Sequence, residues 1–179
     1  SKKMMWTGVW DNPGSGRMSV TNRTEGTLYI RTVVAGVSSG RDVEAASDGL
    51  EVTVRYLDND GRPVDPSSLA QGTDFVAEAT VRNLTAEPLF NLMLTEPAAS
   101  GWEIRPDGGL PMPGVDYRNI RDDRVDSFIP QLPGGGTVTV RTRLNAAYAG
   151  RYTLPAVRCE AMYDGKVSGN TASSIATVY

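Results

Sequence analysis

Cys159 is the only cysteine of the chain and the first residue whose type could do covalent chemistry. In "AVRCEAMY" the alternation of a strand places Val157, Cys159 and Ala161 on one face. A thiol among apolar neighbours has a raised pKa, and the sequence contains no histidine that could deprotonate it. We therefore predict that Cys159 is a buried structural residue and not a nucleophile.

Adjacent carboxylates occur in "RDDR", residues 121–124. Neighbouring side chains on a regular strand point to opposite faces, so Asp122 and Asp123 would not share an acid–base site. Arg121 would share a face with Asp123, and Asp122 with Arg124, which favours ion pairs that fix the junction between a loop and a strand. We predict that these residues form a structural charge network and that none of them is catalytic.

A third candidate is "DNDGRPVD", residues 58–65, with carboxylates at positions 58, 60 and 65. A calcium-binding EF-hand needs glycine at the sixth position of its loop, whereas Gly61 is the fourth residue here. A hairpin turn explains the run without calcium. A single cysteine and the lack of histidine provide no zinc cage, so we expect no metal, no cofactor and no enzymatic activity.

The sequence gives only weak indications of sugar stacking by aromatic residues and of glycosylation. Trp102 follows a turn, and we expect it to start a strand that is anchored in the core. The tripeptides at 22–24 and 83–85 fit the glycosylation acceptor pattern, which short sequences often match by chance. Aromatic side chains that could stack against a sugar are scattered along the chain, which favours core and contact positions: Trp6, Trp10, Trp102, Tyr117 and Tyr163.

Composition limits the remaining function classes. The net charge of −3 provides no basic surface for nucleic acid. With 40% hydrophobic and 22% charged residues the chain can form a packed core. No apolar run approaches the roughly 20 residues that cross a bilayer, so we expect this fragment to make no membrane contact. The opening "SKKMMWTGVW" has no apolar stretch after its lysines, so we expect no signal peptide in it and interpret the chain as a piece of a larger protein.

Period-two alternation recurs along the chain, whereas a helical period does not. Residues 50–57, for example, alternate apolar side chains with Glu51, Thr53 and Arg55. Turns rich in glycine and proline separate the strands. This spacing predicts an all-β, antiparallel, immunoglobulin-like β-sandwich with a partial N-terminal β segment. The remaining expected strands are 17–22, 26–36, 73–83, 88–95, 101–105, 123–129, 136–144, 151–163 and 172–179.

The polar stretch "SSGRDVEAASDG", residues 38–49, is typical of a linker, so we predict a domain boundary near residue 46. Residues 1–46 would hold the terminal strands of a preceding small β domain plus the linker, because a two-stranded ribbon is marginal alone. Residues 47–179 hold enough strands for a complete sandwich. The loop at 105–116 is expected to be mobile or to contact a partner.

Five stretches from residue 47 onward can be compared with known families: "GLEVTVRYLDNDGRPVD", "LAQGTDFVAEATVRN", "GWEIR", "YRNIRDDRVDSF" and "AGRYTLPAVRCEAMYDGKVSG". Through these stretches the chain resembles the C-terminal macroglobulin-like domain of bacterial alpha-2-macroglobulins. Residues 20–37 are similar to the strands that precede that domain in the family. The resemblance thus covers nearly the whole chain, with its landmark dipeptides in the expected order.

This resemblance implies a module of a bacterial protease trap, periplasmic and often lipid-anchored through its parent. In the family a protease cuts a bait region, and an internal thioester between a cysteine and a glutamine three residues later captures the attacker. Here "CEAM" puts Met162 at that position, so this chain does not hold the bond. The implied partners are the thioester domain of the same parent chain and, through the full-length protein, target proteases.

In the family a Met-Tyr pair of this domain covers the thioester before activation, and the resemblance transfers that role to Met162 and Tyr163. A thioether and a phenol exclude water with apolar surface, and the phenol can also form a hydrogen bond. An Asp164–Gly165 turn is expected to present the pair, although "DGKVSGN" lacks the proline often found after it. The alternative interpretation makes Tyr163 a core residue at the end of a strand.

Two other functions stay open at this point. An adhesion or carbohydrate-binding sandwich of a cell-surface protein would show an exposed row of aromatic residues on one face. A metal- or carboxylate-dependent enzyme would bring Asp122 and Asp123 into a shared cleft. An isolated contact between domains is modest and partly polar, so we expect the fragment to be a monomer.

Overall fold

The computed structural model describes residues 7–9, 19–33, 43–106 and 112–179, and the chain divides into the units Ser1–Val37 and Ser38–Tyr179. In the first unit, the described residues 19–33 carry no strand assignment, although strands were expected over 17–22 and 26–36. A two-stranded ribbon is marginally stable unless a third strand or a core packs against it, which is a physical reason for this difference. The rest of those strands lies outside the described residues. The boundary near residue 46 stays a prediction.

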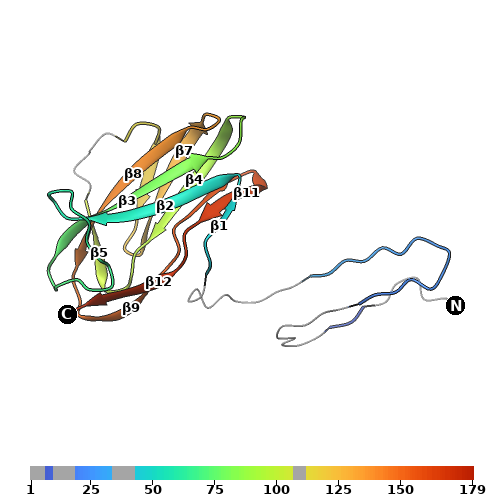
Figure 1. Ribbon diagram of the computed structural model, residues 1–179, viewed down its shortest axis with the longest axis horizontal. Coiled ribbons are helices and arrows are strands. Elements are labelled where there is room, and N and C mark those ends of the chain that lie inside the picture. Colours follow the sequence, from blue (N-terminus) through green and yellow to red (C-terminus); the bar gives the residue numbers. More distant parts are fainter. Residues whose placement is uncertain (1–6, 10–18, 34–42, 107–111) are drawn as a thin grey trace. The chain divides into compact units, whose positions relative to one another are not determined.

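The described part of the second unit forms a set of strands that are shown in Figure 1. Their bounds are β1 (Ala46–Asp48), β2 (Leu50–Leu57), β3 (Asp74–Asn83), β4 (Leu89–Pro97), β5 (Trp102–Arg105), β6 (Tyr117–Ile120), β7 (Arg124–Leu132), β8 (Thr137–Ala146), β9 (Gly150–Leu154), β10 (Arg158–Ala161), β11 (Asp164–Asn170) and β12 (Ser174–Val178). β2 has the bounds that alternation predicted.

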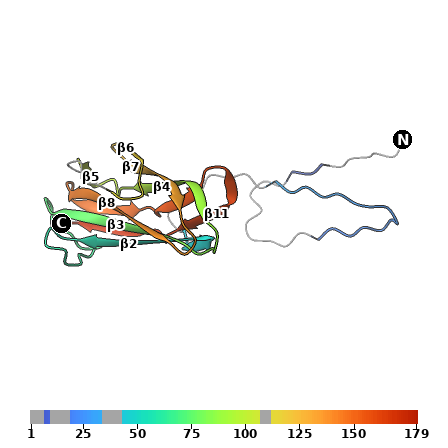
Figure 2. The same cartoon turned by 90° about the horizontal axis from the view of Figure 1, so that it is seen from above.

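The strands form two facing layers (Figure 2). One layer is a six-stranded sheet with the order β1-β11-β10-β4-β7-β6, and the other is a four-stranded sheet with the order β2-β3-β8-β5. β12 and β9 pair as a separate two-stranded sheet. The pairs of these strands are antiparallel. The predicted all-β, antiparallel, immunoglobulin-like sandwich is therefore confirmed.

The core lies where alternation placed it. The inward residues of β3 are buried, among them Phe75 at 1% exposure and Val81 at 0%. Trp102 begins β5 and packs edge-on against two rings, with its centroid 4.9 Å from that of Phe75 and 5.6 Å from that of Tyr56. The expectation that Trp102 starts a strand and is anchored in the core is confirmed.

The outer face of the four-stranded sheet is charged. Cross-strand pairing puts Arg55 of β2, Glu78 of β3 and Arg141 of β8 in one row. Both guanidinium groups donate hydrogen bonds to the Glu78 carboxylate, which holds its pKa below the usual range. The arginine side chains cover Glu78 so well that it is buried although it points outward.

The expected strand over 151–163 is divided in the structure. β9 pairs with β12, whereas β10 lies in the six-stranded sheet between β4 and β11. Pro155 lies between these strands and has no N–H for a ladder hydrogen bond. β1, β6 and β11 were not predicted, because they are short or polar and have weak alternation. In the described chain no helix could span a membrane.

Candidate functional site

Met162 and Tyr163 are the two residues between β10 and β11, and they form the turn of a hairpin. Ala161 pairs with Asp164 at the base of this turn. The chain therefore reverses at Met162–Tyr163, and Asp164 begins β11, so the expected Asp164–Gly165 turn is wrong. Only these two residues lie inside the pair Ala161–Asp164, and the register then shifts, because the next pair is Glu160 with Ser168. We call Met162 and Tyr163 the tip.

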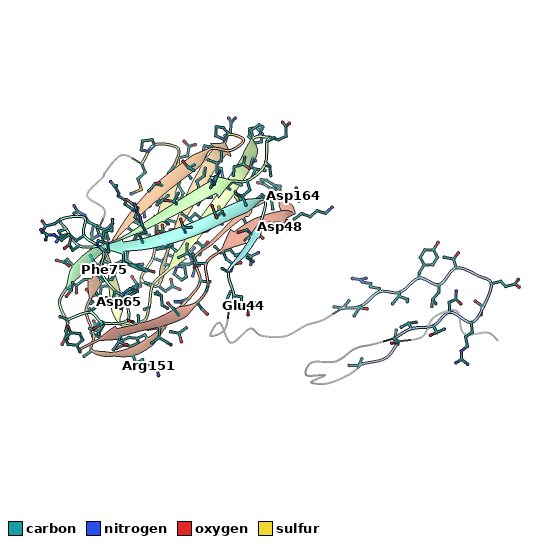
Figure 3. All side chains as sticks on the ribbon, in the orientation of Figure 1. Glu44, Asp48, Asp65, Phe75, Arg151 and Asp164 are labelled. Carbon is teal, nitrogen blue, oxygen red and sulfur yellow. The ribbon has the colours of Figure 1, made fainter. Side chains whose placement is uncertain are left out.

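Both side chains of the tip are exposed to solvent, Met162 at 48% and Tyr163 at 84%. Tyr163 is thus not a core residue of this chain, which excludes the alternative interpretation. Asp164, the first residue after the tip, lies at the end of the sandwich that carries Asp48, opposite the end with Phe75 (Figure 3). The tip is therefore at one end of the sandwich.

The tip is attached to the six-stranded sheet through β4. β10 pairs with β4, and the last pair of this ladder is Ala161 with Leu92. One residue further, the Met162 N–H donates a hydrogen bond of 3.0 Å to the Asn91 carbonyl oxygen. This contact holds the backbone of the turn while the side chains point into solvent. The sequence analysis did not identify Asn91, because no motif marks it.

Residues 121–124 form the turn between β6 and β7, and the Arg121 N–H donates to the Arg124 carbonyl oxygen at 2.9 Å. Asp122 and Asp123 occupy the middle of this turn and are exposed. Arg124 forms ion pairs with Asp123 at 3.0 Å and with Asp126 of β7 at 3.3 Å. Because the residues are in a turn, strand alternation does not decide which side chains meet. The network of Arg121, Asp122, Asp123 and Arg124 stays a prediction.

Cys159 is a free cysteine with no exposed surface. It lies on β10 opposite Gly169 of β11 and belongs to the core cluster that includes Leu92 and Leu94. Burial, and to a smaller extent the Glu160 carboxylate, raise the pKa of the thiol to about 12. The prediction of a buried structural cysteine is confirmed.

The carboxylates of residues 58–65 stabilise a turn. Asp58 Oδ1 accepts hydrogen bonds from the N–H groups of Asp60 at 2.9 Å and Arg62 at 2.8 Å. The Arg62 guanidinium pairs with Asp60 at 2.7 Å. Among the residues that the structure describes, no three acidic, histidine or cysteine side chains are grouped so that they could hold a metal ion.

The asparagine of the acceptor pattern at 83–85 is buried inside the fold. Asn83 has no exposed surface, and its Nδ2 donates to the carbonyl oxygens of Glu87, Leu132 and Pro133 at 2.8–3.1 Å. Its Oδ1 accepts from the Thr85 hydroxyl at 2.8 Å. A glycan on this nitrogen would remove the contacts that hold two turns, so the folded domain does not accept one here.

Of the aromatic residues considered for sugar stacking, the three that the structure describes do not form one row. Trp6 and Trp10 lie outside the described residues, as does the segment 107–111 of the loop that was expected to be mobile or to contact a partner. Trp102 is buried. Tyr117 is exposed on β6, at the sheet edge, and β7 and β4 lie between it and the β10 end that carries Tyr163.

Comparison with known proteins assigns the sandwich to a family. Residues 49–165 match the family described as the bacterial alpha-2-macroglobulin MG10 domain. The alpha-2-macroglobulin of Rickettsia conorii is 30% identical over 131 residues, which are 65% of this chain and 6% of the relative. That of Pasteurella multocida is 22% identical over 166 residues, 87% of this chain and 8% of the relative.

Solved structures show the same fold. A Salmonella alpha-2-macroglobulin reacted with methylamine matches with a TM-score of 0.68 and 23% identity, over 76% of this chain and 10% of that chain. The native conformation of Escherichia coli alpha-2-macroglobulin matches with a TM-score of 0.69 and 18% identity, over 75% and 10% of the two chains. The chain thus spans a tenth or less of these relatives. It belongs to the bacterial alpha-2-macroglobulin family and is a macroglobulin-like domain of that family.

Proposed function

We propose that this chain is a non-catalytic domain of a bacterial alpha-2-macroglobulin that traps proteases. Its tip packs on the thioester domain of the same parent chain and shields the thioester before activation. The observation that carries the proposal is the tip itself, which presents Met162 and Tyr163 to solvent at 48% and 84% exposure from an end of the sandwich. Membership of the bacterial alpha-2-macroglobulin family supports the protease-trapping parent and the thioester domain as the partner.

The chemistry of the two side chains suits this role. Water and amines break a thioester, so the bond persists only where both are excluded. Tyrosine brings a large rigid ring with a hydroxyl at its edge, and methionine a flexible thioether that fills irregular gaps. Both residue types are enriched in protein interfaces. The two-residue turn presents them together, without a neighbouring strand to cover them.

The partners and location follow from the same proposal. The thioester domain would be the direct partner, and target proteases would meet the full-length protein. The parent is proposed to work in the periplasm, with a lipid anchor to the membrane. The isolated domain is proposed to be a monomer, because a single tip provides a small contact surface.

A direct test changes Tyr163→Ala in the full-length protein and follows methylamine uptake and thiol release without any protease. We expect both rates to rise by about tenfold or more, since an aromatic residue at the centre of a contact contributes at least ~2 kcal/mol. Buried Cys159 adds no thiol signal while the domain is folded.

Tyr117→Ala is the matched control, because Tyr117 is also exposed but lies on β6 at the edge of the sheet. It should leave both rates within about twofold of the wild-type values. Circular dichroism establishes that each variant is folded. Equal rates in the wild type and both folded variants would contradict the shielding role.

A further inference from the structure

The backbone of β4 changes direction at Asn91. Leu92 and Leu94 point into the core with 0% exposure, so strict alternation would also bury Phe90. Asn91, however, has a φ of 54°, in the left-handed region that side chains other than glycine rarely adopt. On the N-terminal side of this residue the order is reversed, because Leu89 packs against the core and Phe90 is 53% exposed.

The ladder between β4 and β7 is interrupted at Asn91. Asn91 is skipped in the pairing of these strands, and the residue at its level on β7 is Pro130, which has no N–H to donate. The left-handed conformation costs about 1–2 kcal/mol for most residue types, and asparagine is among the most tolerant. A strained residue inside a strand indicates that some other contact requires it.

The contact that Asn91 does make is with the tip. Its carbonyl oxygen accepts the N–H of Met162 at 3.0 Å. The pair Ala161 and Leu92 sets the register of β10 on β4. One further step along each strand brings Met162 to the level of Asn91, which directly follows Phe90 in the chain. The same strained residue therefore holds the turn and directs Phe90 to the surface beside it.

We propose that Asn91 is a positioning residue for the tip and that Phe90 extends the contact surface on which the thioester domain packs. This inference rests on the proposed function, because it takes the thioester domain as the partner of the tip. Phe90, Met162 and Tyr163 would then form one apolar surface where β4 begins and β10 ends, with exposures of 53%, 48% and 84%. An added aromatic ring beside the tip widens the area from which water is excluded.

The test compares two substitutions of Asn91 in the full-length protein. Glycine adopts a positive φ without steric cost, so Asn91→Gly keeps the backbone that accepts the Met162 N–H. Valine strongly disfavours this φ, so Asn91→Val moves the tip. We expect methylamine uptake without protease to stay near the wild-type rate in Asn91→Gly and to rise about tenfold in Asn91→Val, which matches the backbone cost.

Phe90→Ala is a second, independent variant that leaves Asn91 in place and removes only an exposed side chain. It should raise methylamine uptake several-fold, with the free energy of unfolding within about 0.5 kcal/mol of the wild type. In the 179-residue chain the backbone amide resonances of Met162 and Tyr163 should shift in Asn91→Val and not in Asn91→Gly. A purely structural role of Asn91 would lower stability and leave methylamine uptake by the folded protein unchanged.

The outcomes separate the two proposals. If Tyr163→Ala accelerates uptake while Asn91→Val and Phe90→Ala do not, the tip shields the thioester alone and this inference is overturned. If Tyr163→Ala has no effect, the shielding role fails and the inference fails with it. Should Asn91→Val not fold, an unchanged rate in Phe90→Ala is enough to reject the extended surface.

Discussion

At the scale of single residues, Glu96 of β4 is a carboxylate whose pKa the fold shifts strongly. It is 6% exposed, it accepts hydrogen bonds of 3.2 Å from the Thr142 hydroxyl of β8, and it lies 3.8 Å from the Arg118 guanidinium of β6. Burial raises its pKa to about 7, against the opposing effects of Arg118 and Thr142. Tyr56 of β2 faces the same group, and burial followed by the Glu96 charge raises its pKa as well.

The raised pKa of Glu96 predicts that the stability of the domain depends on pH. The pKa of Glu96 is raised from 4.5 in the unfolded chain to about 7 in the folded one, so the folded state keeps a proton that the unfolded state releases. The stabilisation is complete below pH 4.5 and is lost as the pH rises through 7, at roughly 1.4 kcal/mol per pH unit in between.

Urea unfolding of the wild type and of Glu96→Gln over this pH range measures the effect. Glutamine has no proton to lose, so the slope in the wild type should flatten in the variant. Identical slopes in the two proteins would show that Glu96 keeps an ordinary pKa in the folded state.

At the scale of elements, β11 depends on a glycine for its place beside β2. A Cβ on Gly169 would lie 2.4 Å from the Leu50 carbonyl oxygen, a backbone atom that cannot move alone. Gly169→Ala should therefore lower the free energy of unfolding by about 1–3 kcal/mol, measured by urea denaturation. Gly165→Ala is the control on the same strand, because a Cβ there meets nothing within 4 Å. A loss of equal size in both variants would rule out the close approach as its cause.

Elements also show what local patterns can and cannot predict. Alternation predicted β2, β3 and β8, because each has one face that is buried or partly buried along the strand. β11, "DGKVSGN", is a strand only because it pairs with β10 on one side and β1 on the other. Pairing partners that are distant in sequence are invisible to a local pattern, which is why short polar strands were missed.

At the scale of the whole molecule, the sandwich could be predicted and the site only in part. Periodicity and turn chemistry are enough to specify two layers, and the resemblance singled out Met162 and Tyr163. The position of the turn depends on the pairing of Ala161 with Asp164, and the exposure of Phe90 depends on one backbone angle at Asn91. Asparagine is common in ordinary turns, so its identity alone does not reveal a left-handed residue inside a strand.

Because Cys159 is completely buried, the reactivity of its thiol reports the unfolding of the domain. A small alkylating reagent can reach this sulfur only when the sandwich opens, because the thiol lies in the core and its pKa is raised to about 12. In the 179-residue chain the alkylation rate should therefore rise with urea in step with the unfolded fraction, which mass spectrometry can follow. Modification at an undiminished rate in the folded chain would contradict this. In a full-length protein Cys159 does not react while this domain is folded. Every fast-reacting thiol then belongs to another domain.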